Sequence, residues 1–155
     1  MVESNNGKEQ EIHNYGLDDP WVVQFSREVG PKVRDYVKET YPDAPVTISP
    51  LGTGGKYFGL RLKGYLDGEG VITHLVEIDS LDKMKVELLR HKHDIKGSVF
   101  IGVDDAIWTA RTYNRWKGIM EEIRGELDIS DLKYAVFHDT RKIADWYSGN
   151  NIPNE

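Results

Sequence analysis

The chain has 155 residues, 39% of them hydrophobic, and its 26 acidic and 20 basic side chains give a formal net charge of −6. The absence of cysteine excludes disulfides, iron–sulfur clusters and thiolate zinc sites. No apolar run approaches the roughly 20 residues that a membrane-spanning helix needs, and residues 1–14 lack the apolar segment of a secretory signal, so we expect an intracellular protein, cytoplasmic or, in a eukaryote, nuclear.

The length and the polar ends of the chain predict one α/β domain between two tails. Residues 1–17 show no periodicity and are expected to form a disordered N-terminal tail. Residues 18–150 are expected to form the domain, and residues 151–155 a C-terminal tail. A chain of this size buries about 70% of the surface that it exposes when unfolded, which is enough for a hydrophobic core.

The domain is expected to open with a helix and a short strand. Residues 18–20, Asp-Asp-Pro, are typical of a helix start, because carboxylates accept hydrogen bonds from the first amides and proline suits the first turn. An apolar stripe at helical spacing continues over residues 21–41, with a break or kink at residues 30–31, Gly-Pro. Residues 46–49 are predicted to form a strand, and the glycine-rich residues 52–55 a loop.

An antiparallel hairpin is expected next. Residues 57–66 alternate apolar and polar side chains with the period of a half-buried strand. Residues 67–70, Asp-Gly-Glu-Gly, are typical of a turn, so residues 71–78 should pair back as the second arm. With a two-residue turn, Tyr65 and His74 share one face of this hairpin.

The second half of the chain continues the alternation of helices and strands. Residues 107–113 are ambiguous, because they run directly into a helical stretch, but their aromatic and β-branched side chains favour a strand. The predicted elements are a helix from Ser80 to His93, a strand over 99–103, a hairpin turn at Asp104-Asp105, a strand over 107–113, a helix over 116–125, a strand over 132–137 and a helix over 141–147. Together these elements predict a central mixed β-sheet flanked by helices.

Tyr65, His74 and Lys96 are the candidate catalytic residues. Phe58-Gly59 ahead of Tyr65, then a histidine on the next strand, then a helix closed by Lys96, resemble the catalytic domain of tRNA-splicing endonucleases. A leading helix before hairpin, helix and hairpin is also similar to the layout of a small non-catalytic subunit of the eukaryotic enzyme.

This resemblance covers residues 55–113 and implies a restriction-endonuclease-like fold and metal-independent RNA cleavage that leaves a 2′,3′-cyclic phosphate and a 5′-hydroxyl. It implies that His74 is the general base, Tyr65 the acid or a positioning group, and Lys96 the stabiliser of the charged phosphorane. No cofactor and no metal are expected. The expected partners are structured RNA and either other protein subunits or further copies of the chain. The basic residues expected to bind the RNA are Lys56, Arg61, Lys63 and Arg90.

A ribonuclease-H-like fold is the alternative architecture, since its order of elements, which opens with three consecutive strands, also fits. Glu87, Asp104 and Asp145 stand where the acids of such an enzyme would bind metal. The expected first strand, residues 46–49, carries no carboxylate, which argues against an active enzyme of that type. Whether residues 107–113 form a strand or a helix decides between the two folds.

A non-catalytic subunit or protein-interaction module is the competing function. Trp108, Tyr113 and Trp116 lie close together in the sequence, and such aromatic groups anchor interfaces as readily as they fill cores. The acidic balance fits a protein partner better than a broad RNA surface, because phosphate neutralisation needs basic side chains.

Overall fold

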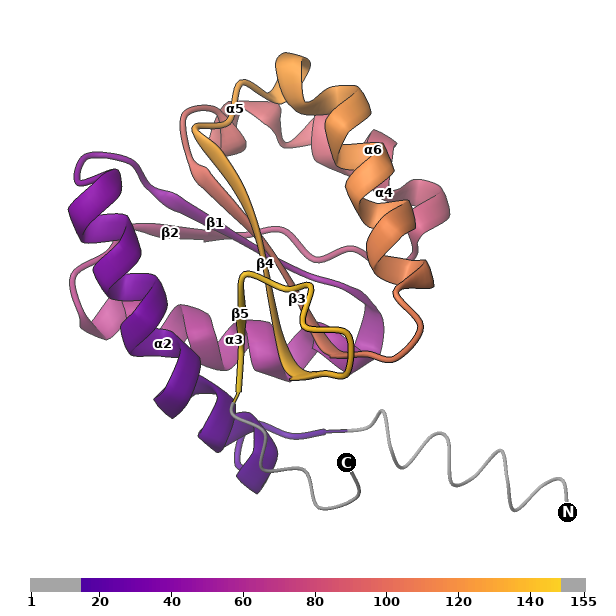
Figure 1. The fold of residues 1–155 in the computed structure, drawn as a ribbon. Helices are drawn as coiled ribbons and strands as arrows, with labels where there is room; N and C mark the ends of the chain where they lie inside the picture. The colour runs from indigo at the N-terminus through magenta and orange to yellow at the C-terminus, as the bar shows by residue number, and fades with distance from the viewer. Residues whose placement is uncertain (1–14, 149–155) are drawn as a thin grey trace, which may run out of the picture.

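The computed structural model describes residues 15–148, which form one five-stranded sheet with helices on both faces (Figure 1). Neighbouring strands follow the order β2-β1-β3-β4-β5, and every neighbouring pair is parallel. The strands are β1 Val46–Pro50, β2 Thr73–Leu75, β3 Val99–Ile107, β4 Asp131–Asp139 and β5 Trp146–Tyr147. The helices are α2 Pro20–Thr40, α3 Gly52–Gly68, α4 Leu81–Arg90, α5 Lys92–Ile95 and α6 Arg111–Leu127.

Two hydrophobic layers enclose the sheet. Helices α2 and α3 cover one face, whereas α4, α5 and α6 cover the other (Figure 1), and each face has its own cluster of buried side chains. Parallel sheets are covered on both faces in this way, so their central strands are apolar throughout. The whole of β1 is accordingly buried, including its polar residues Thr47 and Ser49.

Side chains of β3 alternate between these two layers. Ile101 and Val103 pack in the cluster beneath α2 and α3, whereas Phe100 packs on the side of α6. Gly102 also faces α6, because a Cβ there would lie 2.7 Å from the Trp116 ring. Consecutive residues at the end of β3 therefore face opposite layers.

The expected hairpin is wrong, because residues 57–66 lie within α3. Phe58, Leu62 and Leu66 recur at every fourth position and are fully buried, which is the stripe of an amphipathic helix. A period of two would bury Leu60 equally, but that side chain is only partly buried. The sequence between Phe58 and Leu62 satisfies both periods, and contacts with the sheet favour the helix.

The expected strand over residues 107–113 is also wrong. β3 ends at Ile107, and α6 begins at Arg111. Ala110, between them, has a φ of 67° in the left-handed region and turns the chain from the strand into the helix. Asp104-Asp105 therefore lies within β3 and not in a hairpin turn.

Residues 141–147 form a loop and the short strand β5, where a helix is expected. The Asp139 carboxylate accepts hydrogen bonds from the amides of Arg141 (3.0 Å), Ile143 (2.7 Å) and Ala144 (2.7 Å). Three amides bound to one side chain hold this segment in a loop, since an Asp side chain offers the backbone an alternative to helical hydrogen bonds.

The remaining predicted elements, α2, β1, α4, α6 and β4, are confirmed. Helix α2 begins where the Asp19 carboxylate accepts a hydrogen bond from the Trp21 amide (2.9 Å), and it continues through Pro31 without a break. A single α/β domain with a central sheet between helices is also confirmed. The sheet is parallel rather than mixed, so the restriction-endonuclease-like architecture is wrong. The ribonuclease-H-like alternative does not match either, because α3 separates β1 from β2.

Most of the two expected tails lies outside the described residues, which exclude residues 1–14 and 149–155. Within the described part, no helix combines the length and the apolar character needed to cross a bilayer. The expected cellular compartment stays a prediction.

Candidate functional site

The topology singles out the carboxyl edge of the sheet between β1 and β3. The chain passes from β1 through α3 to β2 on one side, and then through α4 and α5 to β3 on the other. In open α/β sheets, ligands bind outside the carboxyl ends of the strands where the strand order reverses in this way. The loops that follow β1 and β3 therefore border the candidate site.

The loop after β1 presses the first turn of α3 against the end of β3. The Leu51 amide donates to the Val103 carbonyl (2.9 Å), and the Gly52 amide donates to the Ile78 carbonyl (2.7 Å). A Cβ at Gly55 would lie 2.4 Å from the Val103 carbonyl oxygen, so this close approach requires glycine. Helix α3 has no side-chain cap, and the amides of an uncapped first turn are available to an anion.

Two consecutive carboxylates near the end of β3 face opposite sides of the sheet. Asp105 faces α3, where a Cβ at Gly54 would lie 3.0 Å from its Oδ1. Asp104 faces α6, and its Oδ2 accepts a long hydrogen bond from the Tyr134 hydroxyl (3.5 Å). The Asp105 backbone amide donates to Asp104 Oδ1 (2.8 Å), which orients the Asp104 carboxylate.

The environment of this pair disfavours negative charge on Asp104. Burial raises the pKa of the Asp104 carboxyl well above its usual value, and the negative charge of Asp105 raises it further. Burial and the charge of Asp104 likewise raise the pKa of the Tyr134 hydroxyl. Titratable groups shifted by burial and by a specific charged neighbour are typical of functional sites.

The start of α6 brings further amide groups to the same edge. Ala110 precedes the helix in the left-handed conformation, and the Arg111 amide donates to Thr109 Oγ1 (3.4 Å). The first turn of α6 carries no acidic side chain, and the helix has no side-chain cap. A helix N-terminus whose N-cap residue offers no side-chain acceptor, and whose first turn carries an arginine, favours a bound anion such as a phosphate.

The loop after β4 is locked onto the loop after β3. Thr140 Oγ1 donates to the carbonyls of Ile107 (2.8 Å) and Trp108 (3.0 Å). Arg141 Nε also donates to the Trp108 carbonyl (3.3 Å). The Trp108 ring packs on His138 with 4.7 Å between ring centroids, yet 61% of the residue is exposed. A large aromatic ring is therefore held at the carboxyl edge with much of its surface open.

The expected catalytic residues lie on three separate elements, away from the carboxylate pair. Tyr65 lies on α3, where its hydroxyl accepts a hydrogen bond from Arg34 (2.9 Å). His74 lies on the edge strand β2, and Lys96 lies just before the start of β3. No hydrogen bond joins any two of these three residues in the described part of the chain, and the hairpin register that would place Tyr65 beside His74 does not exist.

The basic residues expected to bind RNA mostly have partners on their own helix. Lys63 forms an ion pair with Asp67 (2.9 Å), and Arg90 lies 3.6 Å from Glu87. Lys56 Nζ lies 5.4 Å from the centroid of the neighbouring Tyr57 ring. Arg61 lies on α3 with Lys56 and Lys63, whereas Arg90 ends α4 on the other face of the sheet.

The acids of the ribonuclease-H-like alternative do not gather into a metal site. Among residues 15–148, no group of three or more His, Asp or Glu side chains could hold a metal ion. Asp145 lies beside Lys133 (3.7 Å) and accepts a hydrogen bond from the Tyr134 amide (2.9 Å). This position is explained by the packing of β4 against β5.

Neither side of the carboxyl-edge site is predicted from the sequence. Asp104-Asp105 is expected in a hairpin turn and residues 52–55 in a plain loop. The available signal is an apolar strand that ends in two acids and is followed by a helix, in a chain where strands and helices alternate. Such a chain builds a parallel sheet, whose carboxyl edge then collects these residues.

Comparison with known proteins finds similarity in structure only. No family model matches the chain, and no curated protein matches its sequence. The HGPRT-ase from Leishmania tarentolae in complex with GMP has a TM-score of 0.62 and 19% identity, over 85% of this chain and 76% of that one. The hypoxanthine phosphoribosyltransferase from Trypanosoma cruzi in complex with the product IMP has a TM-score of 0.61 and 20% identity, over 86% and 72% of the two chains.

These matches overturn the resemblance to tRNA-splicing endonucleases. The short motif from Phe58 to Tyr65 lies in a helix, whereas the resemblance requires it on a strand. RNA cleavage and a role in tRNA splicing are wrong with it, and a non-catalytic nuclease-like subunit is not supported either. The expected RNA and protein partners stay untested predictions. What the comparison establishes is the architecture: the chain has the fold of the hypoxanthine phosphoribosyltransferases.

Proposed function

We propose that the protein is a phosphoribosyltransferase that joins a 5-phosphoribosyl group to a purine base. The observation that carries this proposal is the Asp104-Asp105 pair, which lies at the reversal of strand order between the N-terminal turns of α3 and α6. Structures of the same fold are named hypoxanthine phosphoribosyltransferases and hold GMP or IMP, both purine nucleoside 5′-monophosphates.

The N-terminal turn of α6 suits the 5′-phosphate. Its N-cap residue Ala110 makes no side-chain hydrogen bond, and the Arg111 amide donates only a long bond to Thr109 Oγ1 (3.4 Å). Thr109, Arg111 and Thr112 add hydroxyl and guanidinium donors at the same turn. Phosphates bind such turns because the amide groups and the helix dipole both favour negative charge. The left-handed backbone at Ala110 sets the direction in which this turn leaves β3.

The carboxylate pair suits the ribose. Sugar hydroxyls donate hydrogen bonds to carboxylates, and an acid at the end of a strand binds ribose in this way in other α/β folds. A hydroxyl that donates to Asp104 would stabilise its ionised form and offset the burial that raises the pKa of this group.

The exposed ring of Trp108 suits the base. The ring is held on His138 (4.7 Å between centroids), and its free surface lies at the same edge as the carboxylates. A planar purine gains stabilisation by stacking on an aromatic face, which is worth about 1–3 kcal/mol for nucleobases in other proteins.

In the transfer, a ring nitrogen of the base forms a bond to ribose C1 while the bond from C1 to the leaving diphosphate breaks. The diphosphate takes the electron pair of the broken bond, and the proton of that ring nitrogen passes from the base to solvent water. Positive charge develops on the ribose ring as the bond breaks. Carboxylates placed against the ribose stabilise this charge more than the neutral ground state, which is how Asp104 and Asp105 would accelerate the reaction.

The first test measures GMP binding by isothermal titration calorimetry, together with formation of IMP from hypoxanthine and 5-phosphoribosyl 1-diphosphate. We expect Asp105→Asn to weaken GMP binding by about tenfold or more, because hydrogen bonds to charged groups are worth about 1.5–3 kcal/mol. Asp43→Asn is the matched control, since Asp43 is exposed in the loop before β1, at the opposite edge. Binding without IMP formation would leave a nucleotide site but contradict the transferase, and absence of both would contradict the whole proposal.

A further inference from the structure

The segment that precedes α2 lies along the carboxyl edge of the sheet (Figure 1). A turn closed by the Asp19 amide on the Gly16 carbonyl (3.2 Å) connects this segment to the helix. It places the Tyr15 ring edge-on against Phe58, with 4.9 Å between ring centroids, and 6.3 Å from the Trp21 ring. Phe58 belongs to the second turn of α3, whose first turn borders the site.

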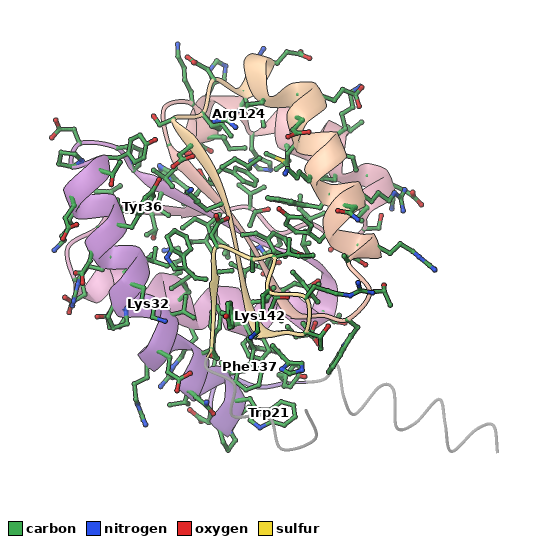
Figure 2. All side chains as sticks on the ribbon, in the orientation of Figure 1. Trp21, Lys32, Tyr36, Arg124, Phe137 and Lys142 are labelled. Carbon is green, nitrogen blue, oxygen red and sulfur yellow. The ribbon has the colours of Figure 1, made fainter. Side chains whose placement is uncertain are left out.

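Four aromatic rings, Tyr15, Trp21, Phe58 and Phe137, form one group that we name the aromatic wall. Trp21 stacks on Phe137 (5.3 Å), and Phe58 contacts the same ring (5.7 Å). Figure 2 shows Trp21 and Phe137 together at the end of α2 where the strands terminate. The aromatic wall therefore closes the α2 and α3 side of the carboxyl edge.

Asp105 is the carboxylate that faces this wall. The alternation along β3 directs Asp105 to the α3 layer, against Gly54, whereas Asp104 faces α6. Tyr15 packs on Phe58, which lies one helical turn after Gly54, the glycine that faces Asp105, so the Tyr15 ring and Asp105 contact the same face of the start of α3. Burial also raises the pKa of the Tyr15 hydroxyl above its usual value, and the charges of Asp105, Asp19 and Asp104 raise it further. Tyr15 therefore stays a neutral hydrogen-bond donor beside an acceptor.

We infer that the Tyr15 hydroxyl donates a hydrogen bond to the same ribose hydroxyl that donates to Asp105. A sugar hydroxyl has one hydrogen to donate and two lone pairs that accept, so it is fully satisfied only by an acceptor and a donor together. An ionised carboxylate supplies the acceptor alone. Tyr15, from a segment outside the α/β core, supplies the missing donor and makes the site selective for the complete sugar. This inference rests on the proposed binding of a nucleotide at the carboxyl edge.

The test compares GMP, 2′-deoxy-GMP and 3′-deoxy-GMP by calorimetry on the full chain, as wild type and as Tyr15→Phe. This substitution keeps the ring on Phe58 and removes only the hydroxyl. Tyr41→Phe is the matched control, because Tyr41 follows the other end of α2, about 30 Å away along a helix of 21 residues. Thermal unfolding of each variant checks that the fold is retained.

We expect Tyr15→Phe to weaken GMP binding by about three- to tenfold, the range of a neutral hydrogen bond. Binding of the deoxy analogue that lacks the contacted hydroxyl should change little, so the preference of the protein for GMP over that analogue falls by the same factor. Tyr41→Phe should bind all three nucleotides as the wild type does.

Two results overturn the inference while the proposed function stands. In one, the wild type binds GMP, and Tyr15→Phe binds each of the three nucleotides as tightly as the wild type does. In the other, Tyr15→Phe loses affinity for all three by the same factor, which indicates a packing role for the tyrosine. A wild type that binds none of the three nucleotides overturns the proposed function and this inference together.

Discussion

Acidic side chains at the two edges of the sheet have opposite surroundings: partners that stabilise their charge at one edge, and a second negative charge at the other. At the amino edge, Asp131 accepts a hydrogen bond from the Tyr36 hydroxyl and lies 3.8 Å from Lys133 Nζ. At the carboxyl edge, the charge that acts most strongly on the partly buried Asp104 is that of another carboxylate, Asp105. Figure 2 shows Tyr36 well along α2 from the end that borders the site.

The polar groups of the amino edge satisfy one another. The Thr47 and Ser98 hydroxyls lie 2.7 Å apart, and Ser98 also donates to the Ile95 carbonyl (2.6 Å). The Gly97 amide donates to the Asp128 carbonyl (2.8 Å) and joins the start of β3 to the end of α6. The comparison teaches that paired polar groups mark the stabilising edge, whereas crowded like charges mark the edge arranged for a ligand.

The largest expected effect is a loss of stability when the packing of α3 against β3 at the carboxyl edge is disrupted. Gly55→Ala places a Cβ 2.4 Å from the Val103 carbonyl oxygen, so backbone must move. We expect a loss of about 3 kcal/mol in the free energy of unfolding, the upper range for overpacking, measured by urea denaturation. Gly64→Ala on the same helix is the control, because a Cβ there meets nothing within 4 Å. Equal stability of the two variants would show that the first turn of α3 does not press on β3.

The next prediction tests whether the amino edge contributes to stability and not to nucleotide binding. Tyr36→Phe leaves the partly buried Asp131 without its hydroxyl donor, and should lower the free energy of unfolding by about 1–2 kcal/mol. GMP binding should remain at the wild-type value. A variant with unchanged stability and weakened nucleotide binding would reverse the assignment of the two edges.

The third prediction concerns Asp104 at the carboxyl edge, where replacing the acidic side chain should increase the free energy of unfolding at neutral pH. Because the folded-state pKa of Asp104 is raised, the unfolded chain ionises first as the pH increases, and stability falls from about pH 4 upward. Asp104→Asn removes this pH-dependent loss of stability, because asparagine does not ionise. Its side-chain carbonyl oxygen can still accept the hydrogen bond from the Asp105 amide. We expect the variant to match the wild type in stability near pH 4 and to be more stable than the wild type at pH 7, while GMP binding weakens.

Denaturation at several pH values measures this difference, with Asp43→Asn as the control that should show none. A variant that matches the wild type near pH 4 and is less stable than the wild type at pH 7 would mean that the Asp104 pKa is lowered, and the assignment of Asp104 as a destabilised carboxylate would be wrong.

The smallest expected effect concerns the turn into α6. Ala110 has a φ of 67°, a conformation that costs a residue with a Cβ about 1 kcal/mol. Ala110→Gly should therefore raise the free energy of unfolding by up to about 1 kcal/mol. Ala106→Gly, within β3, should lower it by about 0.5–1 kcal/mol, since glycine weakens regular structure. Loss of stability in both variants would exclude a strained turn.

Much of the architecture can be predicted from the sequence, and the exceptions have physical causes. Apolar spacing and capping residues identify α2, α4 and α6 because these elements depend on local pattern. The segment from Phe58 to Leu66 satisfies both the helical and the strand period over its first turn, and only contact with the sheet decides between them. The loop after β4 depends on one side chain, Asp139, which binds three amides that a helix would otherwise use.

The candidate site could not be predicted while the sheet was expected to be mixed. Asp104-Asp105 after an apolar strand is compatible with a hairpin turn, and it becomes a site only when β1, β3 and β4 are parallel and end at one edge. Tyr15 lies in a segment without periodicity, so only the three-dimensional contact with Phe58 brings it to the site.

The most direct test of the central claim is a titration of the ¹⁵N-labelled protein with GMP, followed by amide chemical shifts. We expect the amide signals of Thr53, Gly54 and Arg111 to shift, together with the indole signal of Trp108. The amides of Gly97 and Ser130, at the amino edge, should stay in place. Shifts confined to the amino edge, or no shifts at millimolar GMP, would contradict the claim that the carboxyl edge of this sheet binds a purine nucleotide.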